Sequence, residues 1–296
     1  MRVSHSSLDT FATCPRLYQY KYIDRYEPLH DTIELRFGSA WHAGQETYWK
    51  TGNVAKACER FNTQPVNDDE KLQLGMLMVK YDEMYGHRKY TPILIEEKRR
   101  VTMLGAEFDL VMDCLVKNED DEYILIEHKT TGTKDLADGG TYHQRSQVSP
   151  QHAIYCLAAR EMGYNIAAVC YDVTRRIQTR RHKATPEHLR KYRKSDGQIY
   201  MGQFEEDETF PQFKERLQFT INTETDIFKQ FWFEPTEETL AAASRDLEGW
   251  IHAVGNSQYP KSTGNCTKYR NRCEFWTVCH EGNTLYDKTL FKERTR

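Results

Sequence analysis

The amino-acid sequence predicts an α/β protein in which a mixed β-sheet is flanked by helices. Two apolar runs, 108–116 and 123–126, are separated by a short polar turn, which is typical of a β-hairpin. A strand pattern at 92–103 precedes this hairpin, and a helix pattern at 151–163 leads into another apolar strand pattern at 166–176. Because strand, helix and strand in succession imply a crossover connection, the sheet should contain parallel as well as antiparallel neighbours.

The composition sets limits on the class of protein. The 296 residues are 39% hydrophobic and 12% aromatic, which is enough for a large core. No run approaches the roughly 18 apolar residues of a membrane helix, and the N-terminus lacks the apolar centre of a signal peptide. We therefore expect no membrane contact and a cytoplasmic location, in a bacterium or a phage-infected host cell. The net charge of −3 does not indicate a nucleic-acid binder, so any such contact must come from local patches.

We expect one domain, 1–296, made of three consecutive parts. These are a helical part at 1–90, the sheet-bearing core at 91–183 and a second helical part at 184–296. Within the last part, the span 184–256 has the pattern of helices, except that the pattern of 196–222 is ambiguous. The Gly-, Thr- and Ser-rich stretch after Lys129 predicts a mobile loop.

Charged residues gather where the hairpin's second strand ends. Glu127 and Lys129 point to one face of that strand and His128 to the other, because side chains alternate along a strand. Asp109 and Asp113 share a face of the partner strand by the same argument. Charges at the end of a buried strand cost desolvation free energy unless they bind something. Acids beside a lysine on two pairing strands are what metal-assisted phosphodiester hydrolysis needs.

Three further residues have ordinary explanations when taken alone. Gln151 and Tyr155 are four residues apart and share a face of the predicted helix, as a polar edge and a core tyrosine would. His42, beside Trp41 in a predicted helix at 35–50, has the pattern of an ordinary helix histidine.

The eight cysteines, with no secretion signal, favour metal or cluster binding over disulfides. Half of them lie in apolar segments, where we expect buried thiols: Cys58, Cys114, Cys156 and Cys170. The other half lie in polar segments near the two ends of the chain: Cys14, Cys266, Cys273 and Cys279. The last three do not have a zinc-ribbon spacing and need a fourth ligand from elsewhere.

A basic patch follows the predicted strand at 166–176. Its members are Arg175, Arg176, Arg180, Arg181 and Lys183, with His182 among them, and the charged run continues at 189–194. Charge runs are usually solvated surface. Because this one lies next to a sheet strand of the candidate site, it is a candidate for contact with nucleic-acid phosphates, with nearby aromatic residues as partners for unpaired bases.

Several segments resemble, in order, the motifs of the PD-(D/E)xK nuclease superfamily, in particular RecB-type nuclease domains and their iron–sulfur relatives in phages and CRISPR adaptation. They are the opening 4–22, the Gly-to-His segment 37–42, the aspartate strand 107–111, the Glu-x-Lys-Thr element 126–132 and the Gln–Tyr helix 151–155.

The resemblance implies a restriction-endonuclease-like fold and roles for the site residues. His42, Asp109 and Glu127, with the backbone carbonyl of His128, would hold Mn²⁺ or Mg²⁺, and Lys129 would be the catalytic lysine. Gln151 and Tyr155 would position the nucleophile or the DNA backbone. The family glycine is replaced by Glu107, which leaves Glu107 and Asp113 as further candidate ligands.

The resemblance also implies a [4Fe–4S] cluster held by Cys14 together with Cys266, Cys273 and Cys279. Such a cluster would join the two helical ends of the chain. Four thiolates also suit zinc, so that alternative stays open.

Three functions follow as candidates: an exonuclease on single-stranded or end-containing DNA in recombination, repair or phage DNA processing, a structure-specific endonuclease, and a non-catalytic iron–sulfur recombination subunit that binds DNA. The chain has no phosphate-binding loop of a helicase, so a helicase or recombination partner would be a separate chain. Homo-oligomers occur among relatives and are a further expectation.

Overall fold

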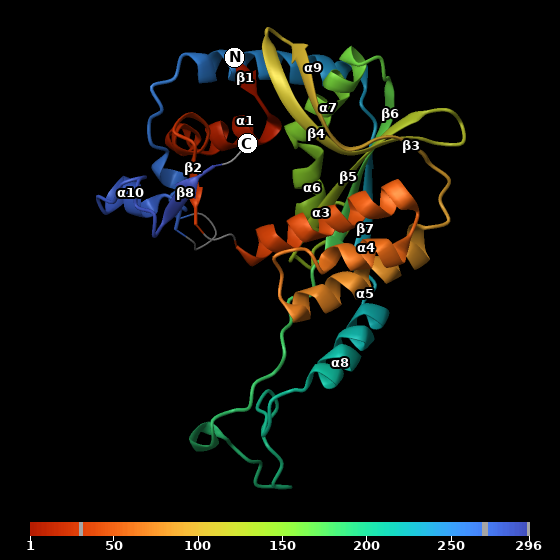
Figure 1. The fold of residues 1–296 in the computed structure, drawn as a ribbon, viewed down its shortest axis with the longest axis vertical. Coiled ribbons are helices and arrows are strands. Elements are labelled where there is room, and N and C mark those ends of the chain that lie inside the picture. The colour runs from red at the N-terminus through yellow and green to blue at the C-terminus, as the bar shows by residue number, and fades with distance from the viewer. Residues whose placement is uncertain (30–31, 268–271, 295–296) are drawn as a thin grey trace.

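The computed structural model describes residues 1–29, 32–267 and 272–294, and its centre is a mixed six-stranded sheet (Figure 1). Two more short strands pair with each other outside that sheet. The strands are β1 Arg2–Val3, β2 Tyr26–Pro28, β3 Thr91–Met103, β4 Ala106–Lys117, β5 Tyr123–Thr131, β6 Ile166–Arg175, β7 Phe228–Phe233 and β8 Phe291–Glu293.

The sheet has the order β1-β4-β5-β6-β7, and β3 pairs with the other side of β4. The hairpins β3–β4 and β4–β5 are antiparallel, β5 and β6 are parallel, and β7 is antiparallel to β6. The predicted mixed sheet with a crossover is therefore confirmed. The sequence analysis missed two of its strands, β1 and β7.

Helices cover both faces of the sheet. They are α1 His5–Thr13, α2 Pro15–Tyr18, α3 Ile33–Thr51, α4 Val54–Phe61, α5 Asp68–Tyr85, α6 Thr141–Gln147, α7 Pro150–Glu161, α8 Phe210–Thr223, α9 Glu237–Gly255 and α10 Trp276–His280. The helical N-terminal part was predicted correctly. A short helix, α6, forms inside the stretch that we expected to be an irregular loop.

β4 contributes side chains to the cores on both faces of the sheet. Phe108 and Leu110 are buried on one face, where they pack with residues of α1, α7 and α9. On the other face, Cys114 and Val116 form a smaller core with Trp49 of α3. Since α3 lies against this second face, it brings its side chains close to the ends of the central strands.

A second core, built mainly from helices, fixes the position of α3. Trp41 and Phe37 of α3 pack with residues of α4, α5 and α8, including Phe61, Leu77 and Phe213. Gly44 lets α3 and α4 approach closely, because a Cβ atom there would lie 2.3 Å from the ring of Phe61.

Between β6 and α8 the chain makes a long excursion, residues 178–208, that we call the arm (Figure 1). It contains one short 3₁₀ turn and one isolated β-bridge. The prediction of helices over 184–256, in which 196–222 stayed ambiguous, was therefore wrong in two places: the arm is mostly irregular from its start, and β7 lies between the helices α8 and α9. Polar and charged residues fill most of the arm, so it lacks the apolar face that would hold a helix against the body.

In the part of the chain that the structure describes, every helix is too short or too polar to cross a lipid bilayer.

Candidate metal centre

The candidate site lies where β4 and β5 part. The two strands pair from Lys117 and Tyr123 as far as Cys114 and Ile126. The next residue on each strand is an acid, Asp113 on β4 and Glu127 on β5. Asp113 lies in the fork between the strands, where its Oδ2 accepts a hydrogen bond of 2.7 Å from the backbone N–H of His128. The fork thus turns two buried acids toward one place.

Three side chains from three elements meet beside this fork. Nδ1 of His42, from α3, lies 3.1 Å from Oε1 of Glu96 and 3.4 Å from Oδ1 of Asp113. One ligand atom from each of the three lies within 4.8 Å of the others, as a metal site requires. Glu96 has a positive φ of 50° within β3, in the left-handed region that costs a non-glycine residue about 1–3 kcal/mol. That strained backbone carries the carboxylate that contacts His42.

Glu127 completes the acidic site from β5. Its Oε2 accepts hydrogen bonds from Nζ of Lys129 at 3.1 Å and from Nε2 of Gln151 at 2.8 Å. Its Oε1 is buried and has no hydrogen-bond partner among the described residues. A buried carboxylate oxygen without a partner is costly, so this atom is available to a cation. Burial, and next the charge of Asp113, raise the pKa of Glu127 to about 8.

The histidine responds to the same concentration of negative charge. Burial alone would lower the pKa of His42, but the carboxylates of Asp113 and Glu96 outweigh burial and raise it to about 10. Burial raises the pKa of Asp113, but the charge of His42 lowers it more, so the pKa lies below its usual range. Two carboxylates at the imidazole, with Glu127 close enough to interact with its charge, therefore form a site that attracts a positive charge. The oxygen donors and the unpartnered Oε1 of Glu127 fit a hard divalent cation.

Lys129 and Gln151 are held as a unit beside Glu127. Nζ of Lys129 donates a hydrogen bond of 2.9 Å to Oε1 of Gln151, which stands in the first turn of α7. Burial opposes the charge of Lys129, but Glu127 and Asp113 raise its pKa, so the ammonium stays charged. Tyr155 is buried one turn further along α7, and burial, then the charge of Glu127, raise its pKa. The structure thus brings Glu127, Lys129, Gln151 and Tyr155 together.

Asp109 lies apart from this group. It is four residues before Asp113 on β4, about 13 Å along a strand. Its carboxylate is half exposed and pairs with Nε of Arg100 at 2.7 Å and Nε of Arg2 at 3.6 Å. Glu107 lies still further out and also faces Arg2. In the structure Asp113, rather than Asp109, lies in the cluster with His42 and Glu96.

The imidazole of His128 faces the opposite side of the sheet from Glu127. It is buried, and its Nδ1 lies 3.0 Å from Oδ2 of Asp172, which also accepts hydrogen bonds from Tyr81 and Gln230. His128 therefore supports the site through its backbone, whose N–H holds Asp113. Its backbone carbonyl as a metal ligand stays a prediction.

Sequence reasoning missed Glu96 altogether. Glu96 lies in a run of charged residues, Glu96 to Arg100, that looks like an exposed edge of a strand. What singles it out is the left-handed backbone at this position, and a positive φ at a glutamate leaves no mark in a sequence.

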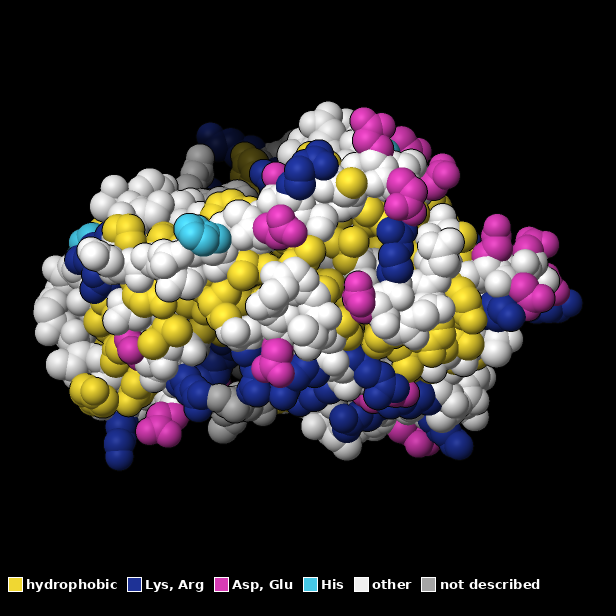
Figure 2. Space-filling view, turned by 90° about the horizontal axis from the view of Figure 1, so that it is seen from above, with side chains coloured by type: hydrophobic (Ala, Val, Ile, Leu, Met, Phe, Trp, Pro, Cys, Tyr) yellow, Lys and Arg dark blue, Asp and Glu magenta, His cyan; other side chains and the backbone are white. Residues whose placement is uncertain are grey.

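The predicted basic patch is mostly paired within the protein. Arg175 is buried, with its guanidinium on the carboxylates of Glu224 and Asp226, so in this structure it is not exposed for the predicted contact with DNA. The cations that follow have partners too: Arg176 pairs with Glu34, Arg181 with Asp69 and Lys183 with Asp207. Arg180 is exposed and has no ion pair among the described residues. Seen from above, Lys and Arg side chains nevertheless gather in a band along one side of the molecule (Figure 2).

The four cysteines near the chain ends line one small pocket. Cys14 is brought to Cys266, Cys273 and Cys279 by contacts between the first helices and the tail: the N–H of Ser262 lies 3.4 Å from Sγ of Cys14, and Nε of Arg16 donates to the carbonyl of Tyr259 at 2.8 Å. Aromatic side chains of Tyr20, Phe275 and Trp276 line the rest of the pocket. The predicted set of four thiols is thus assembled in space. The remaining cysteines are buried, except for Cys58, which is half-buried.

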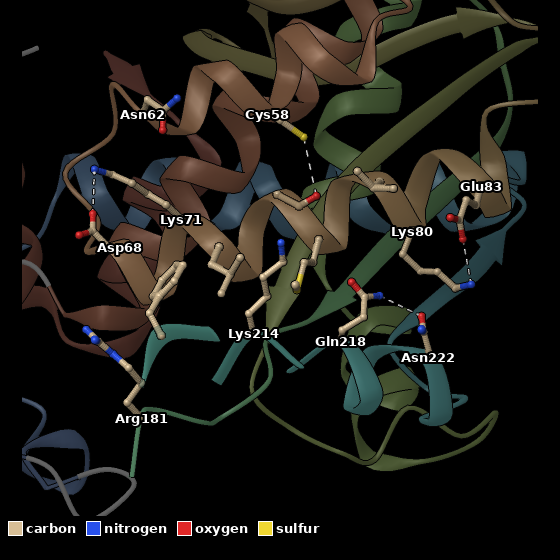
Figure 3. A pocket seen from close by; sticks show the side chains of 15 residues that line it. Cys58, Asn62, Asp68, Lys71, Lys80, Glu83, Arg181, Lys214, Gln218 and Asn222 are labelled. Carbon is tan, nitrogen blue, oxygen red and sulfur yellow. Dashed lines mark hydrogen bonds and ion pairs between the residues drawn. The ribbon is translucent and has the colours of Figure 1, made fainter. Parts of the chain in front are cut away.

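A groove of about 830 Å³ lies between α5 and α8, away from the metal centre (Figure 3). Lys71, Lys80, Arg181 and Lys214 surround it, and its lining includes none of the acidic cluster. The candidate metal centre and this groove are therefore in different places.

The fold is a mixed α/β sheet with a forked pair of central strands, and an acid on one strand, Glu-x-Lys on the other and a nearby histidine make a candidate metal centre there. The chain belongs to the PD-(D/E)XK nuclease superfamily, whose family model matches residues 2–280.

Among solved structures, the chain is similar to a candidate exonuclease from Eubacterium rectale, with 13% identity, a TM-score of 0.48 and coverage of 95% of this chain and 88% of that chain. It is also similar to SSO0001, with 13% identity, a TM-score of 0.37 and coverage of 96% and 87%. No curated protein matches the chain in sequence.

Proposed function

We propose that this protein is a divalent-metal-dependent deoxyribonuclease, most simply an exonuclease on single-stranded or end-containing DNA. The observation that carries the proposal is the buried, unpartnered Oε1 of Glu127, which lies in a group with Lys129 and Gln151 beside the cluster of His42, Glu96 and Asp113. Membership of a nuclease superfamily supports the substrate class.

In this proposal Asp113, Glu127, Glu96 and His42 hold the cation. The ligand set keeps His42 and Glu127 from the sequence analysis, replaces Asp109 by Asp113 and adds Glu96. When bound, a divalent cation polarises the scissile phosphate and lowers the pKa of a water molecule that it carries. The imidazole donor makes the site more favourable for Mn²⁺ than an all-oxygen site would be.

The other residues of the site supply a positive charge next to the cation and fix the positions of the side chains. Lys129 keeps its ammonium charged next to Glu127, where it stabilises negative charge that develops on the phosphate oxygens in the transition state. Gln151 fixes the distance between the two, because its amide donates to Glu127 and accepts from Lys129. Tyr155 lies beneath them as a positioning residue.

The test is degradation of end-labelled linear single-stranded DNA with Mn²⁺, Mg²⁺ or EDTA. Glu127→Gln keeps the size of the side chain but removes the charge, and we expect it to lose about a thousandfold or more of the metal-dependent activity. Glu119→Gln, an exposed acid of the β4–β5 turn, is the matched control and should behave as the wild type. If the wild type leaves the DNA intact with either metal while it binds DNA, the non-catalytic recombination subunit becomes the better account.

The choice between exonuclease and endonuclease rests on the family resemblance alone. Circular single-stranded DNA separates the two, because an exonuclease needs an end. A separate helicase partner and a homo-oligomer stay predictions.

We further propose that Cys14, Cys266, Cys273 and Cys279 hold a [4Fe–4S] cluster. Their shared pocket with an aromatic lining supports this, because burial and few polar neighbours protect such a cluster. Four thiolates also suit zinc, and the metal content of the purified protein decides between the two.

A further inference from the structure

The arm carries a small hairpin at its end. Its tip, residues 188–201, is closed by a bridge between Tyr192 and Ile199 and by a hydrogen bond of 2.9 Å from the N–H of Tyr200 to the carbonyl of Lys191. Gly197, with a φ of +69°, allows the turn between them. Figure 1 shows this end of the arm standing clear of the body, beyond α8. The tip is therefore a shaped element with its surface in solvent.

Charge is divided between the two ends of the arm. At the root, Lys183 pairs with Asp207 at 2.7 Å and Arg216 of α8 pairs with Glu208 at 2.7 Å. These acids of the returning chain neutralise the root. The tip holds four Lys and Arg residues and one acid, a formal charge of +3 in a chain whose net charge is −3.

The cations of the tip differ in what they already contact. Arg193 pairs with the one acid of the tip, Asp196, at 2.7 Å, and the guanidinium of Arg190 donates to the carbonyls of Thr185 and Glu205. Lys191 and Lys194 are exposed and have no ion pair among the described residues. Two cations at the tip are thus free to meet an anion.

Large apolar side chains are exposed on the same tip. The side chains of Tyr192 and Tyr200 are 46% and 50% exposed, and Met201 is fully exposed. Aromatic faces next to free cations are the combination that single-stranded nucleic acid uses, because bases stack on the rings while phosphates contact the charges. A basic tip on an acidic protein also attracts DNA locally, which net charge alone would not do.

We propose that the tip of the arm binds single-stranded DNA at a place separate from the metal centre. Lys191 and Lys194 contact phosphates, and Tyr192 and Tyr200 stack on bases. The inference rests on the proposed function, in that DNA is the substrate, and it moves the nucleic-acid contact from the paired patch at Arg175 to the end of the arm. A strand held at the tip would stay attached while its end is processed at the metal centre.

The binding test uses a fluorescent single-stranded DNA of roughly 60 nucleotides in EDTA, so that no cleavage occurs. The double variant Lys191→Gln/Lys194→Gln should bind more weakly, and the slope of log affinity against log salt concentration should fall by about 1.4, or about 0.7 for each lost phosphate contact. The control, Lys56→Gln/Lys288→Gln, removes the same charge from exposed lysines elsewhere and should keep the slope. Tyr200→Ala should weaken binding roughly 5- to 150-fold, whereas Tyr286→Ala, an exposed tyrosine near the C-terminus, should not.

A short substrate separates this proposal from the nuclease proposal. A DNA of roughly 6 nucleotides is about the size of one single-strand binding site, so a molecule whose end occupies the metal centre has little left to contact the tip, and the tip variants should cut it at the wild-type rate. If the wild type cuts this DNA while the tip variants bind the long DNA as tightly as their controls, the arm proposal fails and the nuclease proposal stands. If the wild type does not cut it, the nuclease proposal fails independently. The alternative is that the tip binds a second copy of this chain, and analytical sedimentation tests it by measuring self-association. A tip variant that loses self-association but binds DNA normally would overturn the proposal.

Discussion

At the scale of single residues, Asp113 and Asp109 make a natural comparison. Both are acids of β4, four residues apart, but Asp113 is buried in the fork with His42 whereas Asp109 is half exposed between two arginines. We expect Asp113→Asn to lose about a hundredfold or more of the metal-dependent nuclease activity and to weaken Mn²⁺ binding, because it removes a charged ligand. Asp109→Asn should change both by less than about threefold, since exposed ion pairs contribute little.

Calorimetric titration with Mn²⁺ and a cleavage assay on both variants give the answer. Equal losses for the two variants would contradict the ligand set proposed here. A loss confined to Asp109→Asn would restore the set that the family resemblance implies.

A second residue-scale prediction concerns the buried carboxylate of Asp172, on β6 behind the metal centre. Burial raises its pKa, but hydrogen bonds from His128, Tyr81 and Gln230 outweigh burial and keep the pKa below its usual range. Asp172→Ala leaves these donors without an acceptor and should lower the free energy of unfolding by about 3–5 kcal/mol. Urea denaturation measures it, with the exposed Asp120→Ala as a control expected to change stability by less than about 0.5 kcal/mol. A loss below about 1 kcal/mol in Asp172→Ala would show that the network does not stabilise the sheet.

At the scale of elements, two helix glycines test how tightly the helical layers pack. An added methyl at Gly44 of α3 would overlap the ring of Phe61 of α4, so Gly44→Ala should destabilise the protein by about 1–3 kcal/mol despite the better helix propensity of alanine. Gly249 of α9 has open space around it, so Gly249→Ala should stabilise by about 0.5–1 kcal/mol. Melting temperatures of both variants check the opposite signs, and two shifts in the same direction would contradict the packing argument.

The elements also show where sequence patterns carry information. Apolar runs predicted β4 and β5, and a helix pattern from residue 151 predicted α7, which begins at Pro150. β1 and β7 were missed because they are short and gain their stability from partners far along the chain, Glu107 and Phe108 for β1 and most of β6 for β7. The sequence located the candidate site only in outline. Glu127 and Lys129 could be found because they follow a strong strand pattern. Glu96 and Asp113 come to the site through the fork and the local backbone geometry, which a sequence pattern does not show.

At the scale of the whole molecule, the arm separates two strands along the sequence that are neighbours in the sheet. β7 follows the arm and β6 precedes it, yet the two pair along their length from Val169 to Thr174. Trypsin should cut the exposed arm tip first, and the two fragments should stay together and keep the melting temperature within about 5 °C, since no core contact is lost. Gel filtration before and after denaturation tests this, and fragments that separate without denaturant would contradict it.

The cysteine pocket gives the other prediction at this scale. Protein purified without oxygen should contain about four iron and four sulfide per chain, and Cys14→Ser should lose most of both. Its fold should persist, because Arg16, Lys21 and the β2–β8 pair also join the chain ends. Cys58→Ser, outside the pocket, is the control and should keep full iron content. Zinc in place of iron in anaerobic protein would overturn the cluster proposal.

The small strand β1 has a consequence for how the molecule is made. Residues 2 and 3 pair with β4, more than a hundred positions later, and Leu8 and Phe11 of α1 join a core that is completed by α9. During synthesis on the ribosome, the apolar side chains of this first segment therefore stay exposed to solvent until α9 has emerged and the core can form. Such distant pairing slows folding and exposes the nascent chain to aggregation. Expression at low temperature or with chaperones should raise the yield of folded protein for this reason.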